Sequence, residues 1–196
     1  MPKPSLKESI LDAGLRAMFR TGYHGTSVRD VTTAAGAPHG SFTNHFRSKE
    51  AFASEVLDRY FANTKDLVAE ALQDSALTPR QRLRRYLDII TGRLEADAFH
   101  RGCLIGDLSL EASGSSEALR ERLVAIFAEW RVPFAACIRQ AQASGEIAAD
   151  FAPDELADFL LASWQGAILR MKVERNGAAL ERFKKIAFQT VFREPS

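Results

Sequence analysis

Apolar residues recur at the spacing of an α-helix along most of this chain. The first segment carries four large apolar residues at i, i+4, i+7 and i+8, on one face of a helix: Leu11, Leu15, Met18 and Phe19. No segment shows the sustained alternation of apolar and polar residues that indicates a half-buried strand. The pattern therefore predicts an all-α protein.

Capping residues divide the first part of this pattern into separate helices. Ser5 with Glu8 three residues later is typical of a helix N-terminus, and Gly22 is expected to end that helix. Thr26 is then expected to cap a short second helix that runs to residue 35.

A tight break separates the second helix from the third. Gly36-Ala37-Pro38 supplies a turn, and Pro38 suits the first position of a brief helix over about 39–46. Ser48 is expected to cap a long helix that reaches about residue 74. Five further helices are expected over about 79–97, 103–112, 116–144, 153–175 and 178–193.

Charge is distributed unevenly along the 196 residues. The first fifty hold seven Lys and Arg against four Asp and Glu, a balance of +3, whereas the remainder holds 19 against 21, a balance of −2. Three of the four histidines also lie in the first fifty residues. A basic head on a mildly acidic body favours a polyanion as the partner of the head alone.

Three short helices, with a glycine-containing turn between the second and third, predict a helix-turn-helix that binds double-stranded DNA. In the third helix Phe42 and Phe46 stand at i, i+4 and are expected to face inward, which leaves the polar residues between them for base edges and phosphates. The candidate DNA contacts are Thr26, Ser27, Arg29, Pro38, His39, Gly40, Ser41, Thr43, Asn44, His45 and Lys49.

The stretch "GTSVRDVTTAAGAPHGSFTNHFRSKEAF" at residues 25–52 resembles the DNA-binding domain of the TetR family of transcriptional repressors. The resemblance implies residues 1–50 as a helix-turn-helix DNA-binding domain and 51–196 as a larger helical ligand-binding and dimerisation domain. It also implies a repressor that binds a palindromic operator as a homodimer. Seven residues fall on the family's DNA-contacting positions: Thr26, His39, Gly40, Thr43, Asn44, His45 and Lys49.

Two residues depart from the family pattern. Thr43 stands where Tyr is usual, and His39 stands where Lys is common. These departures favour an alternative interpretation: a helical enzyme or ligand carrier on the same fold that has lost specific DNA binding. A solvated helix face is the other interpretation of the polar residues in the third helix.

The last two helices carry apolar stripes that suit a dimer interface, which the resemblance implies as a four-helix arrangement. The alternative is that both stripes belong to the core of a single chain. The candidate interface residues are Leu156, Leu160, Trp164, Ile168, Phe183, Ile186 and Val191.

Large apolar side chains of the middle helices are candidates for a pocket that binds a small-molecule inducer, as the resemblance implies. Aromatic residues at helical spacing are also typical of an ordinary core. The candidate pocket residues are Tyr60, Phe61, Phe99, Cys103, Phe127, Trp130, Phe134 and Trp164.

Cys103 is a candidate sensor of oxidants or electrophiles. It follows His100-Arg101-Gly102 at a predicted helix start, where cations and the helix N-terminus stabilise a thiolate. The local "GCL" resembles a subgroup of TetR-like repressors that includes the repressor of N-ethylmaleimide reductase, some of which respond to electrophiles through this cysteine. The alternative is a small buried residue, which is also the interpretation of Cys137.

Several function classes find no support in the sequence. No catalytic triad, phosphate-binding loop or set of metal ligands is recognisable, so we expect neither an enzyme nor a metal or other cofactor. The two cysteines form no CxxC pair or disulfide framework, and no apolar run approaches transmembrane length. We therefore expect a cytoplasmic protein without a membrane partner.

Overall fold

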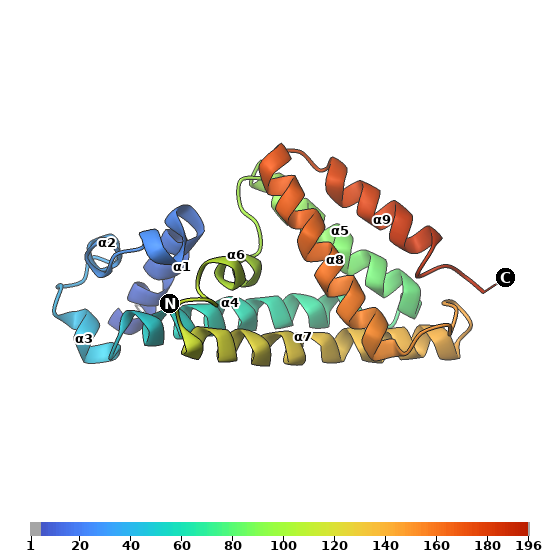
Figure 1. Cartoon of the computed structure of the whole chain (residues 1–196), viewed down its shortest axis with the longest axis horizontal. Helices are drawn as coiled ribbons and strands as arrows, with labels where there is room; N and C mark the ends of the chain where they lie inside the picture. The colour runs from blue at the N-terminus through green and yellow to red at the C-terminus, as the bar shows by residue number, and fades with distance from the viewer. Residues whose placement is uncertain (1–4, 196) are drawn as a thin grey trace. The chain divides into compact units, whose positions relative to one another are not determined.

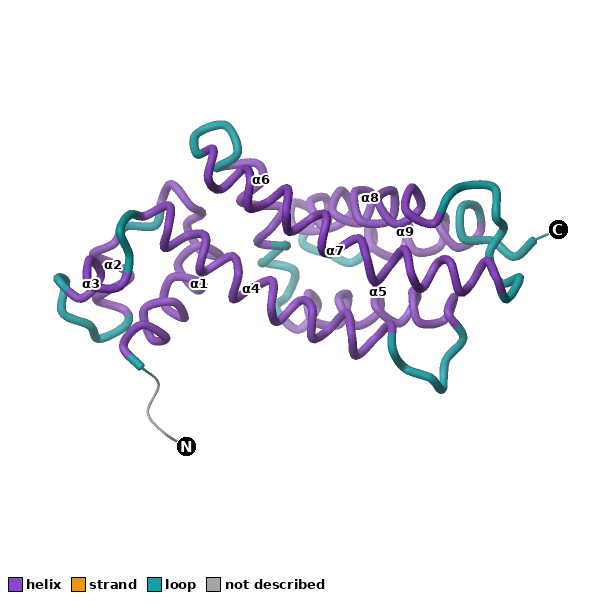
Figure 2. Tube along the Cα trace, turned by 90° about the horizontal axis from the view of Figure 1, so that it is seen from below, coloured by secondary structure: helices purple, strands orange, loops and turns teal. Residues whose placement is uncertain are grey.

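The computed structural model describes residues 5–195, and every regular element in that range is an α-helix (Figure 1). Figure 2 shows the same residues as helices joined by loops, which confirms the predicted all-α class. The helices are α1 (Leu6–Gly25), α2 (Val28–Ala34), α3 (Ser41–His45), α4 (Lys49–Leu72), α5 (Pro79–Ala96), α6 (Leu104–Glu111), α7 (Glu117–Ala143), α8 (Pro153–Glu174) and α9 (Ala178–Gln189).

The chain forms two compact units. The N-terminal unit combines Met1–Asn63 with Leu104–Ile126, and the C-terminal unit combines Thr64–Cys103 with Phe127–Ser196. Helices α4 and α7 contribute residues to both units, and α6 belongs to the N-terminal unit. The functional boundary expected at residue 50 stays a prediction.

Three of the predicted helix starts are confirmed by their capping bonds. The hydroxyl oxygens of Ser5, Ser48 and Thr78 each accept a hydrogen bond from the backbone N–H three residues later, at 3.2, 3.1 and 3.4 Å. These bonds satisfy backbone donors that have no partner within the first turn of a helix.

Three other boundaries were predicted wrongly. Ser27, not Thr26, caps α2, because the Ser27 hydroxyl oxygen accepts from the Asp30 N–H at 3.1 Å. The third helix begins at Ser41, because residues 39–40 form a turn. The last helix ends at Gln189, since Thr190 leaves the helical conformation at φ −121° and ψ −77°.

Aromatic packing forms the core of the N-terminal unit around α3. The rings of Phe42, Phe46 and Phe52 lie with centroids 5.0–5.1 Å apart, and each side chain is at most 3% exposed. Gly14 of α1 makes room for this cluster, because a Cβ there would lie 2.2 Å from Cζ of Phe52. The cluster therefore joins α1, α3 and α4 at close quarters.

The C-terminal unit has its own core. Tyr86 of α5 and Phe134 of α7 meet edge to face at 4.8 Å, and both are fully buried. Lys184 of α9 is 3% exposed, and its Nζ lies 2.8 Å from Asp88 of α5 and 2.5 Å from Glu181. A buried ammonium group needs such partners, so the ion pair between Lys184 and Asp88 fixes α9 against α5.

Gly14→Ala should destabilise the protein by about 1–3 kcal/mol, because the new methyl group overpacks the ring of Phe52. Gly92→Ala is the matched control: Gly92 is an exposed helical glycine with open space around it, so alanine there should stabilise by about 0.5–1 kcal/mol. Urea unfolding followed by circular dichroism measures both. Equal midpoints for the two variants would contradict the close packing described for Gly14.

Candidate functional site

A glycine turn joins α2 to α3 as a helix-turn-helix. Gly36 adopts φ +63°, a conformation that favours glycine. The N–H of Ala37 donates to the carbonyl of Thr32 at 2.9 Å, and the N–H of Gly36 donates to that of Thr33 at 3.1 Å. These bonds close the end of α2 and turn the chain sharply toward α3.

Helix α3 has an apolar inner side and a polar outer side. Phe42 and Phe46 are buried in the aromatic cluster, as their spacing predicted. Between and before them, five of the predicted DNA contacts are exposed: Pro38, His39, Thr43, Asn44 and His45. The backbone of Gly40 is exposed as well, so the outer side of α3 offers small and polar groups that suit the edges of bases.

Two of the predicted DNA contacts are buried, which corrects their assignment as side chains that face DNA. Thr26 is 3% exposed, and its hydroxyl donates to the carbonyl of Gly22 at 2.6 Å. Ser41 is 8% exposed at the first residue of α3. The hydroxyl of Thr26 therefore serves the local fold, and neither side chain is presented to solvent.

Ser27, Arg29 and Lys49 lie at helix starts near the outer surface. Ser27 and Arg29 are exposed at the beginning of α2. Lys49 is half-buried: its Nζ donates to the carbonyl of His24 at 3.3 Å and lies 4.7 Å from the ring centre of Tyr23. Partial burial lowers the pKa of Lys49, and the carboxylate of Glu111 acts in the opposite direction.

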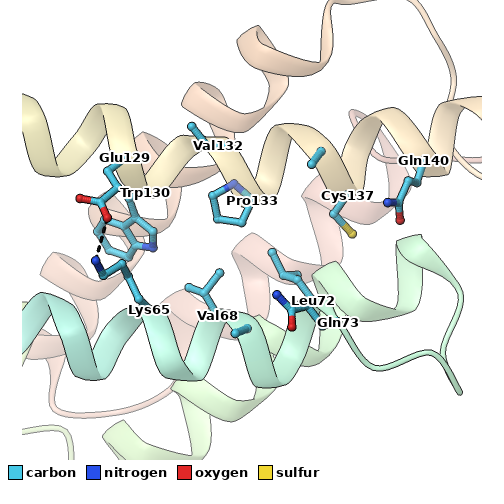
Figure 3. A pocket seen from close by; sticks show the side chains of 12 residues that line it. Lys65, Val68, Leu72, Gln73, Glu129, Trp130, Val132, Pro133, Cys137 and Gln140 are labelled. Carbon is cyan, nitrogen blue, oxygen red and sulfur yellow. Dashed lines mark hydrogen bonds and ion pairs between the residues drawn. The ribbon is translucent and has the colours of Figure 1, made fainter.

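A cavity of about 470 Å³ lies between α4 and α7 within the C-terminal unit (Figure 3). Its walls are mostly apolar, and at one end Lys65 Nζ lies 2.7 Å from Glu129 Oε1. Of the predicted pocket residues, Trp130 is the one that lines this cavity. The lining residues are Lys65, Val68, Ala69, Leu72, Gln73, Glu129, Trp130, Val132, Pro133, Ala136, Cys137 and Gln140.

The other predicted pocket residues lie outside the lining of this cavity, and several pack in the cores. Phe61, Phe134 and Trp164 are at most 1% exposed. Tyr60 contacts Phe19 edge to face at 5.6 Å. A core position and a pocket position have the same helical spacing, so periodicity alone does not separate them.

Cys103 is 7% exposed and immediately precedes α6. The neighbouring Arg101 pairs with Asp97 at 2.8 Å, which lowers the pKa of the Asp97 carboxyl. Burial raises the pKa of Tyr86, and electrostatic interaction with Cys103 raises it further. The thiol of Cys103 thus lies in the interior, near a buried phenol.

Cys137 differs from Cys103 in its surroundings. It lines the cavity, is 3% exposed, and its thiol donates to the carbonyl of Pro79 at 3.2 Å. Burial raises the pKa of this thiol to about 11. Because the thiolate is the nucleophile, Cys137 is held in its unreactive form at neutral pH.

Comparisons with known proteins agree with the helix-turn-helix geometry. The family described as "Bacterial regulatory proteins, tetR family" matches residues 10–56, and "Tetracyclin repressor-like, C-terminal domain" matches residues 79–187. The chain belongs to the TetR family. It is 42% identical over 191 residues to the HTH-type transcriptional repressor DhaR of Mycobacterium sp. (strain GP1), covering 97% of this chain and 94% of that protein.

Two solved structures extend this relationship to three dimensions. Regulatory protein TetR from Rhodobacter sphaeroides superposes with a TM-score of 0.88 at 34% identity, covering 93% of this chain and 97% of that one. The reduced form of NemR from E. coli superposes with a TM-score of 0.87 at 26% identity, covering 98% and 100%. The TetR fold therefore extends over nearly the whole chain.

In this TetR-family chain the predicted interface stripe of α8 is core. Leu156, Leu160, Trp164 and Ile168 are each at most 5% exposed within the single chain. Helix α8 lies against α9, and Trp164 contacts Phe183 of α9 at a centroid distance of 5.4 Å. Their assignment to a dimer surface is therefore corrected.

A different face of α8 is open, and sequence reasoning missed it. Phe159, Ser163, Gly166 and Arg170 line a hollow of about 270 Å³. Residues of α9 and of the turn after it complete the lining, among them the predicted Phe183, Ile186 and Val191. Ile186 is 53% exposed. The four α8 residues stand at i, i+4, i+7 and i+11, on one helical face, but only Phe159 among them is large and apolar.

Two further features concern the described part of this TetR-family chain. Within residues 5–195 no helix is long and apolar enough to cross a membrane. In the same range no three His, Cys, Asp or Glu side chains gather in a way that could hold a metal ion.

Proposed function

We propose that this protein is a ligand-responsive transcriptional repressor that binds a palindromic double-stranded operator as a homodimer in the bacterial cytoplasm. The observation that carries the proposal is α3, whose inner side is anchored by Phe42 and Phe46 and whose outer side exposes His39, Thr43 and Asn44. The names of DhaR and NemR, both repressors, support the same function.

Phosphate contacts follow from the helix starts around α3. The N-termini of α2 and α4 present backbone N–H groups and the positive end of the helix dipole, which attract phosphate. Ser27 and Arg29 are exposed at the first of these ends. The +3 balance of the first fifty residues adds a general attraction to DNA that weakens as salt is added.

The open face of α8 and α9 is the surface we assign to the dimer. It is hollow, its lining includes Phe159 and Phe183, and Ile186 beside the hollow is 53% exposed. A two-fold axis there would set the Ile186 of each subunit against the hollow of the other. Two copies of α3 would then read two half-sites separated by one turn of DNA.

The cavity between α4 and α7 is the site we assign to the inducer. Lys65 and Glu129 neutralise each other at its end, and Val68, Leu72 and Trp130 supply apolar walls. An uncharged, mainly apolar molecule of drug-like size fits such a site best, because a charged one would compete with an existing ion pair. Binding there releases DNA if the ligand prefers the conformation with low operator affinity.

Modification of Cys103 is a second route to release. The thiolate of Cys103, at the start of α6, would form a carbon–sulfur bond with one carbon of an activated C=C bond; the π bond breaks, and the other carbon takes up a proton from water. A structure of the related NemR from E. coli is that of its reduced form, which is consistent with a redox-dependent state in that protein.

Asn44→Ala should weaken binding to a duplex selected by the wild-type protein from a random library, by about 1–3 kcal/mol, because it removes a base contact. Asn63→Ala, which changes an exposed Asn of α4 outside α3, is the matched control and should bind like wild type. Fluorescence anisotropy at several salt concentrations measures both. If the wild-type protein enriches no duplex, the proposed function is wrong.

Ala136→Phe should block the cavity and leave operator binding unchanged. Compounds are first chosen from an uncharged organic library by their ability to release the wild-type protein from the selected duplex. Their potency should then fall at least about tenfold in this variant, since the ring occupies their space. Ala128→Phe on an exposed position of α7 is the control. Undiminished potency in Ala136→Phe would place the inducer elsewhere.

Cys103→Ser should abolish release of the duplex by N-ethylmaleimide and leave DNA affinity unchanged. Cys137→Ser should be released like wild type, because burial raises the pKa of the Cys137 thiol to about 11 and so keeps it protonated at neutral pH. Mass spectrometry of the native protein at neutral pH identifies the modified cysteine. Release of Cys103→Ser at the wild-type rate would remove Cys103 from the mechanism.

A further inference from the structure

The end of α6 lies against the end of α1 within the N-terminal unit, where both helices are labelled in Figure 1. The carboxylate of Glu111, the last residue of α6, accepts hydrogen bonds from the backbone N–H groups of Tyr23 at 2.8 Å and His24 at 3.4 Å. The backbone carbonyl of Glu111 also lies 3.0 Å from Nε2 of His24. One residue thus makes three contacts with consecutive residues of α1.

Gly22 is shaped to receive this carboxylate. It adopts φ +71° and ψ −178°, which turns the chain out of the regular helix just before Tyr23 and His24. The backbone N–H groups of these two residues are thereby available to Glu111. A Cβ on residue 22 would lie 2.4 Å from both carboxylate oxygens, so any residue but glycine would displace Glu111.

The turn that Glu111 holds leads directly into the proposed DNA-binding surface. Thr26 donates from its hydroxyl to the carbonyl of Gly22 at 2.6 Å, and Ser27 then caps α2. From the other side Lys49, the first residue of α4, donates to the carbonyl of His24 at 3.3 Å. The starts of α2 and α4, both assigned to phosphate, therefore rest on the same turn.

The negative charge of Glu111 allows two possible roles of this residue in DNA binding to be told apart. A carboxylate beside a DNA-binding surface repels phosphate, so electrostatics alone predicts that its removal would tighten DNA binding. If the carboxylate instead holds the backbone in place, its removal should weaken DNA binding, because two N–H groups lose their acceptor. The two roles therefore differ in the sign of the effect.

We propose that Glu111 is a positioning residue for DNA binding: its carboxylate fixes the turn at residues 22–26 and, through it, the starts of α2 and α4. The inference rests on the proposed function and extends it to a residue outside the helix-turn-helix. Because α6 begins one residue after Cys103, a displacement of α6 would withdraw this carboxylate from the turn.

Glu111→Ala should weaken binding to the selected duplex by about tenfold, which corresponds to about 1.4 kcal/mol. Glu111→Asp keeps the charge but is one methylene too short, so it should weaken binding by a smaller factor. Glu121→Ala removes an exposed carboxylate from α7 in the same unit and should bind at least as tightly as wild type. Anisotropy titrations, corrected for the active fraction of each preparation, measure all three.

Amide hydrogen exchange tests the position of the effect. In both Glu111 variants the N–H groups of Tyr23 and His24 should exchange faster than in wild type, while amides in the middle of α1 keep their protection. If Glu111→Ala fails to fold, Glu111→Asp and Glu111→Gln carry the test, because Gln keeps one acceptor and should bind more tightly than Asp does. Wild-type affinity or tighter binding in both Ala and Asp variants would overturn the proposal. Failure of the wild-type protein to select any duplex would instead overturn the proposed function.

Discussion

A recognition helix of five residues is too short to persist by itself, so everything that α3 does depends on how it is anchored. The anchors are Phe42 and Phe46, whose rings lie against Phe52 of α4. The close approach of α1 at Gly14 completes the enclosure. The orientation of the polar side chains of α3 is therefore set by aromatic packing rather than by the backbone hydrogen bonds of the helix.

Most helix boundaries could be predicted because capping is local chemistry. Ser5, Ser48 and Thr78 cap through N–H groups three residues away, and no distant residue changes that outcome. Thr26 and Ser27 show the limit. Both residues are good caps, and the choice between them is made by Gly22, whose carbonyl accepts from the Thr26 hydroxyl and leaves Ser27 to cap α2. That carbonyl is placed by a kink of the backbone, which neither hydroxyl residue predicts.

The α8 helix illustrates a second limit. Periodicity correctly identifies an apolar face that includes Leu156 and Leu160, but it does not say whether the same chain or another copy covers that face. In α8 the same chain covers it: Leu156 and Leu160 are at most 3% exposed, and Trp164 of the same face contacts Phe183 of α9. A second, weaker pattern through Phe159 and Gly166 is left open because small and polar residues interrupt it. The mixed composition of that face hid it from a search for large apolar residues.

The contact between Glu111 and residues 22–24 had no signal in the sequence, since 88 positions separate the carboxylate from Tyr23. The contact also bears on where the chain is divided into an N-terminal and a C-terminal part. A boundary drawn at residue 50 follows the sequence motif, whereas the N-terminal unit recruits Leu104–Ile126. Arg122 pairs with Asp58 at 2.5 Å in the same unit, so the recruited segment is held at more than one point. The N-terminal unit, which contains the helix-turn-helix, is thus built from two segments that are far apart in the sequence. The peptide bond between Cys103 and Leu104 therefore joins the C-terminal unit directly to α6, which contacts α1 in the N-terminal unit.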